Sequence, residues 1–417
     1  MTAPAGRPAR GGGAVDGKLG LVKGLYVVAA VTMAGVSAVF VLLAELEDRY
    51  GLTKGGLGLI AGSAFAAALV SQLGLSRYAD RGWGLVLLRS GVLMASAGLL
   101  WFAAATELWQ FVAARAVLGA SVGLIVPAAR RAIVLASHGD LGERLGVFYA
   151  SYLAGFVFGP PVAGVLTVVA DVRLPFVVFG LLVAASSLAL RDVVVDAPGS
   201  RGAPIAHADR RVLRRLLASR RLIAALLVVI SFRYSVGVFE PLWATYLDDL
   251  GAGTLVVTLS LTVFALPMLL IARWAGRLSD TYGPRLTSVL SAAATVPLMA
   301  CYGYVGALPF VMLMAIPHGI GEAIQSPGTQ AAVADAAPTR DAAAAQGLAE
   351  AAGSAAAAIG AFTAAPVFDV LGAGPAWLIA GVTMAVLLGT SALLDRPRRR
   401  PPVGGRRETH PVPSPVA

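Results

Sequence analysis

The sequence predicts an all-α membrane protein, with twelve transmembrane helices arranged as two pseudo-symmetric bundles of six. The 417 residues are 57% hydrophobic and only 13% charged, about half the charge expected of a soluble chain. Apolar runs of about 20 residues recur throughout, and each is long enough to cross about 30 Å of hydrocarbon as a helix. The chain also resembles itself at a separation of 200 residues, as in the pairs Asp48 and Asp248, and Gly119 and Gly319. A repeat of this size in an apolar chain is typical of secondary transporters.

The apolar runs are continuous and do not alternate with a period of two, so they favour helices over the strands of a membrane barrel. The expected spans are 21–43, 56–75, 86–105, 108–130, 143–167, 173–190, 222–246, 254–274, 286–305, 307–329, 342–366 and 374–394. The sequence therefore predicts a tail at 1–20, a first bundle at 21–190, a linker at 191–221, a second bundle at 222–395 and a tail at 396–417.

The distribution of positive charge predicts the orientation. With these spans, only Arg49, Lys54 and Arg173 among the 33 lysines and arginines fall in loops on one side. The positive-inside rule places the opposite side, and both termini, in the cytoplasm. A net charge of +10 would suit a nucleic-acid-binding protein if the chain were soluble. Because the basic residues are spread over every inner loop, we expect a protein of the cytoplasmic membrane with no nucleic-acid partner.

The end of the central linker, 209–222, alternates arginine pairs with valine and leucine. One interpretation is an amphipathic helix that lies on the anionic inner leaflet. The other is an arginine-rich linker that only enforces topology. The sequence pattern is compatible with both.

The connection between spans eight and nine reads Gly276-Arg-Leu-Ser-Asp280-Thr-Tyr-Gly283-Pro-Arg285. It resembles the loop signature G-x-L-[AS]-D-x-x-G-x-[RK] of the major facilitator superfamily. Glycine near a helix end allows close helix approach, and the aspartate can stabilise the N-terminus of a helix in the opposite half. The resemblance implies the twelve-helix fold of that family and a latch, meaning an inner-side contact that stabilises the outward-open state.

The same connection in the first half keeps the pair Asp80 and Arg81. Ser76 stands where the motif has its leading glycine, the trailing glycine is displaced, and the closing basic pair is absent. These departures predict a weaker latch in the first half than in the second.

The fifth span carries a second pattern, which resembles the antiporter signature G-x8-G-x3-G-P-x2-G-G of the same superfamily. Its residues are Gly146, Gly155, Gly159, Pro160 and Gly164, and alanine replaces one glycine. Glycines four residues apart form a smooth face for helix packing, and the proline bends the helix. The alternative is that this pattern serves only close helix packing, because small residues at this spacing are common in helix bundles. The resemblance implies an exporter that exchanges its substrate for protons.

Six ionisable residues inside the expected spans are candidates for function. A charged side chain there costs roughly 2.5–3.5 kcal/mol on insertion scales, so such residues generally face a cavity or a partner. The six candidates for proton coupling or for the substrate cavity are Arg115, Arg233, Glu240, His318, Glu322 and Glu350. Arg115 begins the pattern Arg-x3-Gly, which is similar to one in the superfamily.

Helical spacing suggests two pairs among these six. His318 and Glu322 are four residues apart and are predicted to form the proton-responsive pair. Arg233 and Glu240 are seven apart and share a helix face, so Arg233 is expected to balance Glu240. Glu240 is then a second candidate for binding a proton or a cationic substrate, and a purely structural salt bridge is the alternative.

We therefore expect a monomeric secondary transporter that exports a small organic molecule in exchange for protons. The alternatives are a proton-coupled importer on the same fold and a membrane sensor or scaffold that transports nothing. No Gly-x4-Gly-Lys-[Ser/Thr] loop is present, which favours an ion gradient over ATP. A single cysteine, Cys301, excludes an intramolecular disulfide and a cysteine-based metal cluster. No enzymatic activity, metal or cofactor is expected.

Overall fold

The computed structural model describes residues 12–78, 82–137, 141–191, 193 and 210–395, and every regular element in them is helical. The α-helices are α1 (Gly12–Val41), α2 (Leu43–Tyr50), α3 (Lys54–Tyr78), α4 (Gly84–Ala104), α5 (Leu108–Ala136), α6 (Leu141–Val169), α7 (Leu174–Ser186), α8 (Arg210–Ala218), α9 (Arg220–Asp249), α10 (Thr254–Leu270), α11 (Ala272–Tyr282), α12 (Pro284–Cys301), α13 (Leu308–Ala336), α14 (Ala342–Leu371) and α15 (Ala373–Leu394). Short 3-10 turns are η2 (Ser187–Leu190), η3 (Tyr302–Tyr304) and η4 (Thr339–Asp341). Most of the two tails and of the linker at 191–221, together with the motif residues Asp80 and Arg81, lies outside the described residues.

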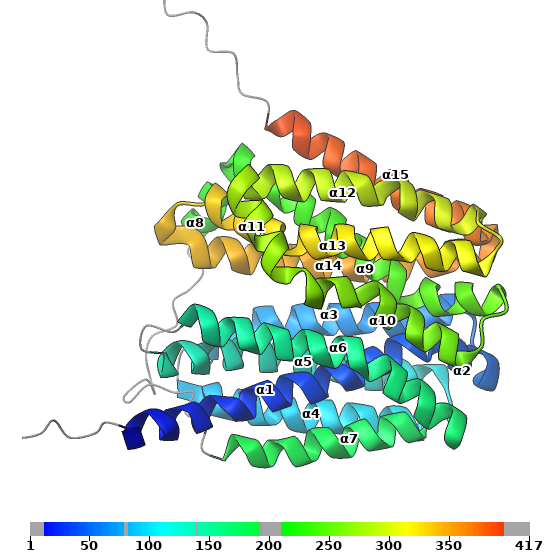
Figure 1. The fold of residues 1–417 in the computed structure, drawn as a ribbon, viewed down its shortest axis with the longest axis horizontal. Helices are drawn as coiled ribbons and strands as arrows, with labels where there is room; N and C mark the ends of the chain where they lie inside the picture. Colours follow the sequence, from blue (N-terminus) through cyan, green and yellow to red (C-terminus); the bar gives the residue numbers. More distant parts are fainter. Residues whose placement is uncertain (1–11, 79–81, 138–140, 192, 194–209, 396–417) are drawn as a thin grey trace, which may run out of the picture.

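The helices form two bundles that lie one above the other (Figure 1). The first bundle, which we call the N-half, contains α1 to α7; in it α1 packs on α6 and α7, and α5 packs on α3 and α4. The second bundle, the C-half, contains α8 to α15; in it α9 packs on α14 and α15, and α13 packs on α10 and α12. The two halves meet along α3 with α14 and along α6 with α10. These two helix pairs make most of the contact between the halves, and α1, α2 and α9 add smaller contacts.

Helix length and apolarity support a multi-pass membrane protein. Among the described residues, nine helices are long and apolar enough to cross a bilayer, and the pair α10 and α11, bent by 54°, makes up to ten. The segment Leu174–Leu190 is apolar but shorter. Helix α13 has the length of a span and is not in the apolar set, because polar residues such as His318, Glu322 and Gln325 occupy its interior. With these two segments the twelve-helix arrangement is complete.

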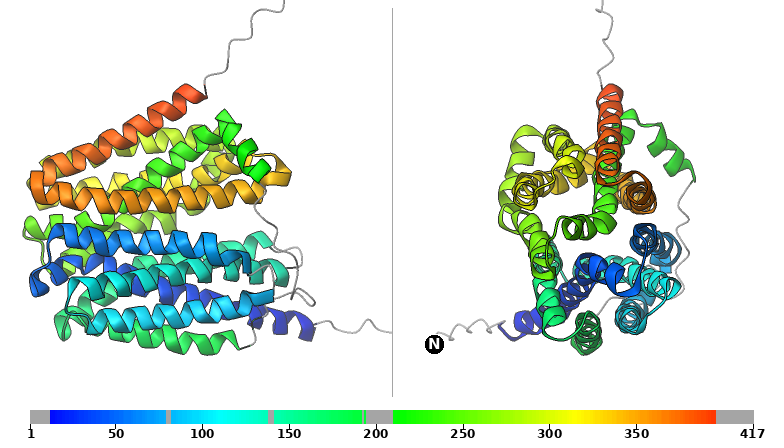
Figure 2. Two further views of the ribbon diagram at one scale, coloured as in Figure 1. Left: turned by 180° about the vertical axis from the view of Figure 1, so that it is seen from behind. Right: turned by 90° about the vertical axis from the view of Figure 1, so that its right-hand side faces the viewer.

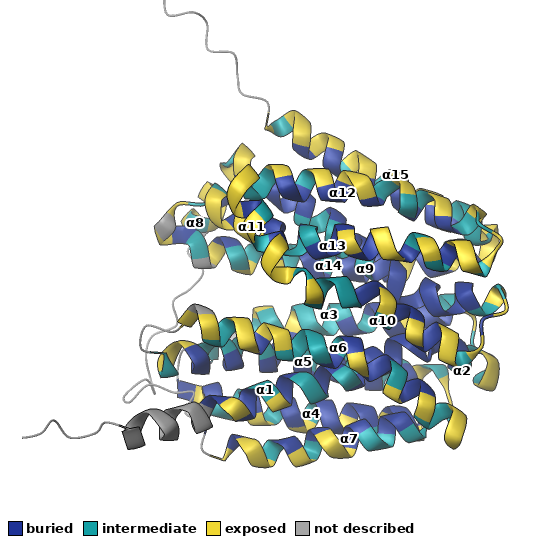
Figure 3. Cartoon of the chain, in the orientation of Figure 1, coloured by how far each residue is buried: buried dark blue, intermediate teal, exposed yellow. Residues whose placement is uncertain are grey.

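Both described termini lie at one end of the bundles, together with α8 (Figures 1 and 2). We call this the terminal end and the opposite end, near α2, the distal end. Buried residues face the inside of each bundle, whereas much of the outer surface is exposed (Figure 3). Large apolar side chains lie exposed on that surface, including Val70, Val169 and Leu270. An exposed apolar surface of this extent matches the hydrocarbon of a bilayer.

The repeat seen in the sequence has a counterpart in the packing. A methyl group on Gly119 would overlap the backbone of Ala64 in α3, and one on Gly319 would overlap the backbone of Phe264 in α10. Equivalent glycines therefore bring equivalent helices into close contact in both halves. Gly51 and Gly251 both have positive φ, 62° and 83°, where the chain turns at the distal end. Glycine adopts this left-handed conformation without the strain that a side chain would introduce.

Candidate functional site

A buried ion pair joins the two halves. Arg115 of α5 donates through Nη2 to Oε1 of Glu240 in α9, and the two side chains are 2% and 7% exposed. A second guanidinium nitrogen of Arg115 lies 3.4 Å from the carbonyl oxygen of Val36 in α1, whereas its Nε has no hydrogen-bond partner. Burial removes water from both charges, so each depends on the other for compensation. The pair is a cross-half contact in the interior of the protein.

The structure corrects the partner predicted for Glu240. Arg233 lies on the same helix, but its guanidinium lies over the ring of Phe65 in α3, with its carbon 5.9 Å from the ring centroid. Its side chain also packs against Gly353 of α14, where a Cβ would come within 2.8 Å of it. The spacing of seven residues predicted that Arg233 would pair with Glu240. In the structure Arg115 of α5 is the partner of Glu240 instead.

A polar network surrounds Glu322 in the middle of α13. The hydroxyl of Ser235 in α9 donates to Oε1 of Glu322 at 3.2 Å. His318 Nε2 lies 3.7 Å from the same oxygen, and its Nδ1 lies 3.1 Å from the hydroxyl of Tyr302. The side chains of His318 and Glu322 are 0% and 5% exposed. The structure thus brings the predicted pair of His318 and Glu322 together. A proton bound to either side chain would be shielded from water.

Ser235 and Tyr302 complete this network and were not predicted from the sequence, and nor was the buried Gln325 beside it. Ser235 and Tyr302 come from other elements than α13, so helical spacing along α13 does not reveal them. Gln325, one turn from Glu322, is 1% exposed and neither of its side-chain amide atoms has a hydrogen-bond partner. Serine and glutamine inside apolar spans were the available signal, because such groups are expected to find a polar partner.

An aromatic cluster encloses the histidine side of the network. Phe239 stacks on Trp243 with ring centroids 4.8 Å apart and meets His318 edge-on at 5.2 Å. The cluster consists of Phe239, Trp243, Phe264, Tyr302, His318 and Trp377. These rings exclude water from His318 and fix its orientation between Tyr302 and Glu322.

Glu350 occupies a different environment from the other acidic candidates. It lies toward the terminal end of α14, where its Oε1 is 3.8 Å from Nη2 of Arg130 in α5. The side chains are 46% and 36% exposed. The guanidinium of Arg130 also lies over the ring of Tyr149 at 5.0 Å. This second cross-half ion pair is therefore solvated, in contrast to the pair of Arg115 and Glu240.

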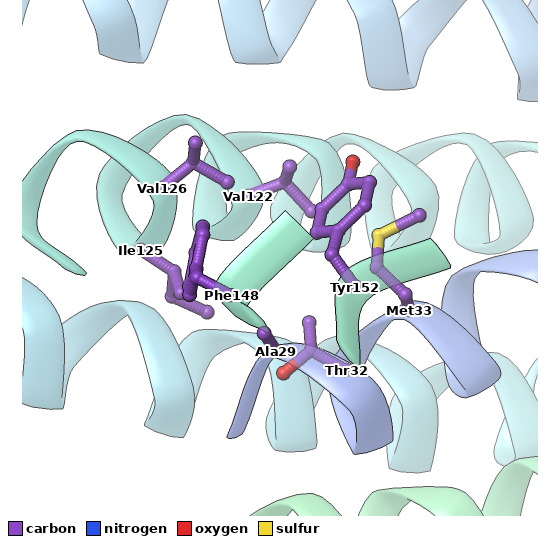
Figure 4. Close-up of a pocket in the computed structure, with 8 residues that line it drawn as sticks. All are labelled: Ala29, Thr32, Met33, Val122, Ile125, Val126, Phe148 and Tyr152. Atoms are coloured by element: carbon purple, nitrogen blue, oxygen red, sulfur yellow. The ribbon is translucent and has the colours of Figure 1, made fainter. Parts of the chain in front are cut away.

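A small hollow lies inside the N-half, between α1, α5 and α6 (Figure 4). The hollow is partly open to the surroundings and is lined by Ala29, Thr32, Met33, Val122, Ile125, Val126, Phe148 and Tyr152. The hydroxyl of Thr32 is buried and without a hydrogen-bond partner. The lining is mostly apolar, so the hollow suits an apolar group.

The glycine pattern of the fifth span lies on α6, where most of its members face a neighbouring helix. Side chains at Gly155 or Gly159 would overlap Ala30 and Ala34 of α1, and one at Gly164 would overlap Thr258 of α10. Gly146 has no atom within 4 Å of the position of a Cβ. Pro160 lies within the continuous helix α6. Gly164 contributes to the contact between the halves, because α6 and α10 belong to different bundles.

The second-half loop motif forms the end of α11 and the start of α12. Gly283 has φ 89° and precedes Pro284 at the first position of α12. Arg285 pairs with Asp395 at 2.5 Å and donates to the carbonyl oxygen of Ser391 at 3.2 Å, which ties α12 to the end of α15. Asp280 is exposed, and a Cβ on Gly276 would meet nothing within 4 Å. In this state Arg285 therefore makes its contacts within the C-half.

The distal end carries polar contacts between the two halves. Lys54 of α3 lies 3.3 Å from Glu47 in its own half and 3.2 Å from Asp249 of α9. The hydroxyl of Thr254 donates to Glu45. The backbone N–H of Gly55 also donates to Asp369 at this end, at 2.6 Å. Deeper between the halves, the hydroxyl of Thr262 donates to the carbonyl oxygen of Val157 at 2.8 Å. The halves are thus closed against each other at this end.

Comparison with known proteins decides the family. Residues 25–246 and 225–417 match the family model of the Major Facilitator Superfamily. The chain belongs to this superfamily. It is therefore a transporter-family protein that crosses the membrane several times.

Two curated superfamily members align with part of the chain. Multidrug resistance protein MdtG of Serratia proteamaculans is 26% identical over 254 residues, which cover 60% of this chain and 61% of that protein. An uncharacterized MFS-type transporter of Methanocaldococcus jannaschii is 26% identical over 177 residues, which cover 41% and 46%. The chain thus spans between about half and three fifths of the relatives it matches.

Solved structures of the superfamily share the fold. A bacterial homolog of the human lysosomal transporter Spinster, in an inward-facing and occupied conformation, aligns with TM-score 0.73 and 13% identity over 90% of this chain and 96% of that one. The nucleoside transporter NupG aligns with TM-score 0.75 and 11% identity over 91% and 100%. The superfamily fold accounts for the two stacked bundles and for the pseudo-symmetric glycine contacts. Among the described residues, no group of three or more His, Cys, Asp or Glu side chains could hold a metal ion.

Proposed function

We propose that the protein exports a small organic molecule in exchange for protons by alternating access. It acts as a monomer in the cytoplasmic membrane, with both termini in the cytoplasm, and catalyses no chemical reaction. The observation that carries the proposal is the buried network of Glu322, His318 and Ser235 at the centre of a membrane helix. A carboxylate in this position is costly to keep charged, so its proton occupancy responds to access from either side.

The roles of the other intramembrane charges follow from their burial. Arg115 and Glu240 form the buried contact across the halves, so movement of the halves must break or reshape it. Arg233 lies near the same interface, with its guanidinium over the ring of Phe65 in α3. Glu350 and Arg130 form the solvated contact nearer the terminal end. We assign Glu322 and His318 to proton binding and the remaining four residues to the cavity and its opening.

Two observations support export. The glycine pattern of α6 resembles the antiporter signature, and its glycines lie at the contacts of α6 with α1 and α10. MdtG, which aligns with three fifths of this chain, is a multidrug resistance protein. A proton-coupled importer on the same fold is the competing function.

The closed distal end defines the state of the transporter. Given the proposed orientation, this end faces outward, so access from outside is blocked by the contacts around Lys54, Asp249 and Asp369. The Spinster homolog that shares the fold is in an inward-facing conformation. The exposure of Asp280 agrees with a latch that is released in this state.

The experiment is proton flux in liposomes that contain the purified protein, measured against a panel of cationic, neutral and anionic compounds. Glu322→Gln keeps the acceptor for Ser235 but cannot release a proton, so we expect substrate-coupled proton flux to be lost while the unfolding temperature is retained. Glu143→Gln, an exposed charge at the start of α6, is the matched control and should transport normally. Normal coupled flux in Glu322→Gln would refute the assignment. Substrate entry that follows protons inward would establish the importer instead.

A further inference from the structure

Helix α8 lies across the terminal end of the C-half. When the bundle is viewed along its helices, α8 is seen lengthwise and projects beyond the edge of the bundle (Figure 2, right). It contacts α9 and α14. Arg215 on α8 pairs with Asp341 of η4 at 3.0 Å, which attaches the helix to the connection between α13 and α14. These contacts fix the position of α8, and its axis runs across the helices of the bundle.

One face of α8 is already covered by the protein. Leu216 is 2% exposed and packs with Val212 against the terminal ends of α9, α13 and α14. The two residues are four apart, so they lie on the same side of the helix. This face accounts for only part of the apolar surface of α8.

A second apolar stripe on α8 has no cover among the described residues. Leu213 and Leu217 are 41% and 47% exposed. Each follows a residue of the covered face by one position, which turns it about 100° around the helix axis. The stripe is therefore turned to one side of the covered face and out of the contact with the C-half, at the edge of the bundle, where a bilayer would surround the protein.

Positive charge flanks this stripe. Arg211 and Arg214 are exposed on the remaining arc of α8, and Arg220 is exposed where α9 begins. An apolar stripe beside arginines is typical of helices that lie in a membrane interface. Guanidinium groups also match the geometry of phosphate oxygens, and a negatively charged lipid surface attracts them.

We propose that α8 docks on the anionic surface of the bilayer around the C-half. Leu213 and Leu217 enter the boundary between headgroups and acyl chains, and Arg214 and Arg220 bind lipid phosphates. The charge of the helix and its position at the bundle edge favour a lipid surface over a protein partner. Because Arg215 links α8 to η4, docking also restrains the connection between α13, which carries Glu322, and α14. The proposal does not depend on what is transported or in which direction.

The test uses the full chain with Cys301 replaced by serine and one new cysteine for an environment-sensitive fluorophore. Leu217→Cys places the fluorophore on the stripe, and Ala218→Cys, also exposed, places it on the polar arc as the matched control. Both proteins are measured in detergent, in phosphatidylcholine vesicles, and in phosphatidylcholine vesicles with phosphatidylglycerol added. We expect a blue shift and quenching by spin-labelled lipid at position 217 in the anionic vesicles, with a much smaller change at position 218.

Charge variants test the anionic preference. Arg214→Gln should lower the ratio of docked to undocked helix about fivefold in anionic vesicles, which corresponds to about 1 kcal/mol per arginine near such a surface. Arg214→Lys should retain docking, and Arg191→Gln, an exposed charge at the terminal end of the N-half, should change nothing.

Three results would overturn the proposal. One is a fluorophore at position 217 that, in anionic vesicles, reports an environment as polar as the one at position 218. Another is equal docking in neutral and anionic vesicles, which would remove the role of phosphate. The third is a fluorophore at position 217 that is shielded from water and yet is not quenched by spin-labelled lipid, which would assign the stripe to another part of the protein.

Discussion

The buried pair of Arg115 and Glu240 leads to the sharpest stability prediction. With side chains only 2% and 7% exposed, neither charge can be compensated by water when its partner is removed. Breaking a buried pair costs about 3–5 kcal/mol, because one uncompensated charge remains. Glu240→Gln should therefore lower the free energy of unfolding by about that amount, or roughly two to three and a half powers of ten in the folded-to-unfolded ratio.

The solvated pair supplies the matched control. Glu350→Gln removes the same charge from a cross-half pair that is 46% and 36% exposed and 3.8 Å apart. Solvent screening limits such a pair to about 0–1 kcal/mol. The measurement is reversible denaturation of each purified variant in detergent micelles, followed by near-ultraviolet circular dichroism.

A double variant distinguishes two causes of the expected destabilisation: loss of the attraction between Arg115 and Glu240, and burial of a charge that has no partner. Arg115→Met with Glu240→Leu removes both charges and fills the site with apolar side chains. Replacing a buried pair in this way is often neutral or stabilising, so the double variant should be much more stable than Glu240→Gln alone. Two results would refute this prediction. One is that Glu240→Gln lowers the free energy of unfolding no more than Glu350→Gln does, and the other is that the double variant is as unstable as Glu240→Gln.

Three further predictions concern packing, the latch and pH. Gly155→Leu should prevent α6 from packing on α1 and sharply reduce folded protein in detergent, whereas Gly146→Leu, at an open position, should have little effect; equal yields would contradict this. Asp280→Asn should weaken the outward-open state and raise labelling by cysteine probes on the cytoplasmic side, and unchanged labelling would count against the latch. The backbone N–H of Arg173, assisted by the guanidinium of Arg49, holds the pKa of Asp171 below its usual value. The unfolded chain then binds more protons, so the stability from this contact is present above the ordinary aspartate pKa of about 3.9 and is lost as pH falls through the lower folded pKa. Asp171→Ala should lower the melting temperature at neutral pH, and that difference should shrink in acid; a difference independent of pH would refute the assignment.

The two parts of the polar network differ in how far sequence could predict them. The approach of His318 and Glu322 follows from their spacing of four residues in one helix, and the structure brings them to 3.7 Å. Their partners Ser235 and Tyr302 come from outside α13, and no periodicity within α13 identifies them. Spacing predicts contacts only along one helix, because contacts between helices also depend on how each helix is rotated about its axis.

The glycine patterns show the same limit. Glycines at spacing four indicated a packing face on the fifth span, and Gly155 and Gly159 do lie against α1. The sequence did not show that Gly164 lies against α10 of the other half, so that a single pattern serves both a bundle interior and the interface between bundles.

Apolarity and the internal repeat were enough to predict a multi-pass helical protein of two related halves, and to locate the charged residues inside its spans. These properties depend on the apolarity and spacing of residues within each segment, which the chain carries locally. The pairing of Glu240 with Arg115, and not with Arg233, became visible only once the helices were placed against each other. The same holds for Ser235 and Tyr302, which complete the site around Glu322 and His318. The physical reason is that close packing between helices sets their rotation and depth, and these in turn select which buried polar groups meet.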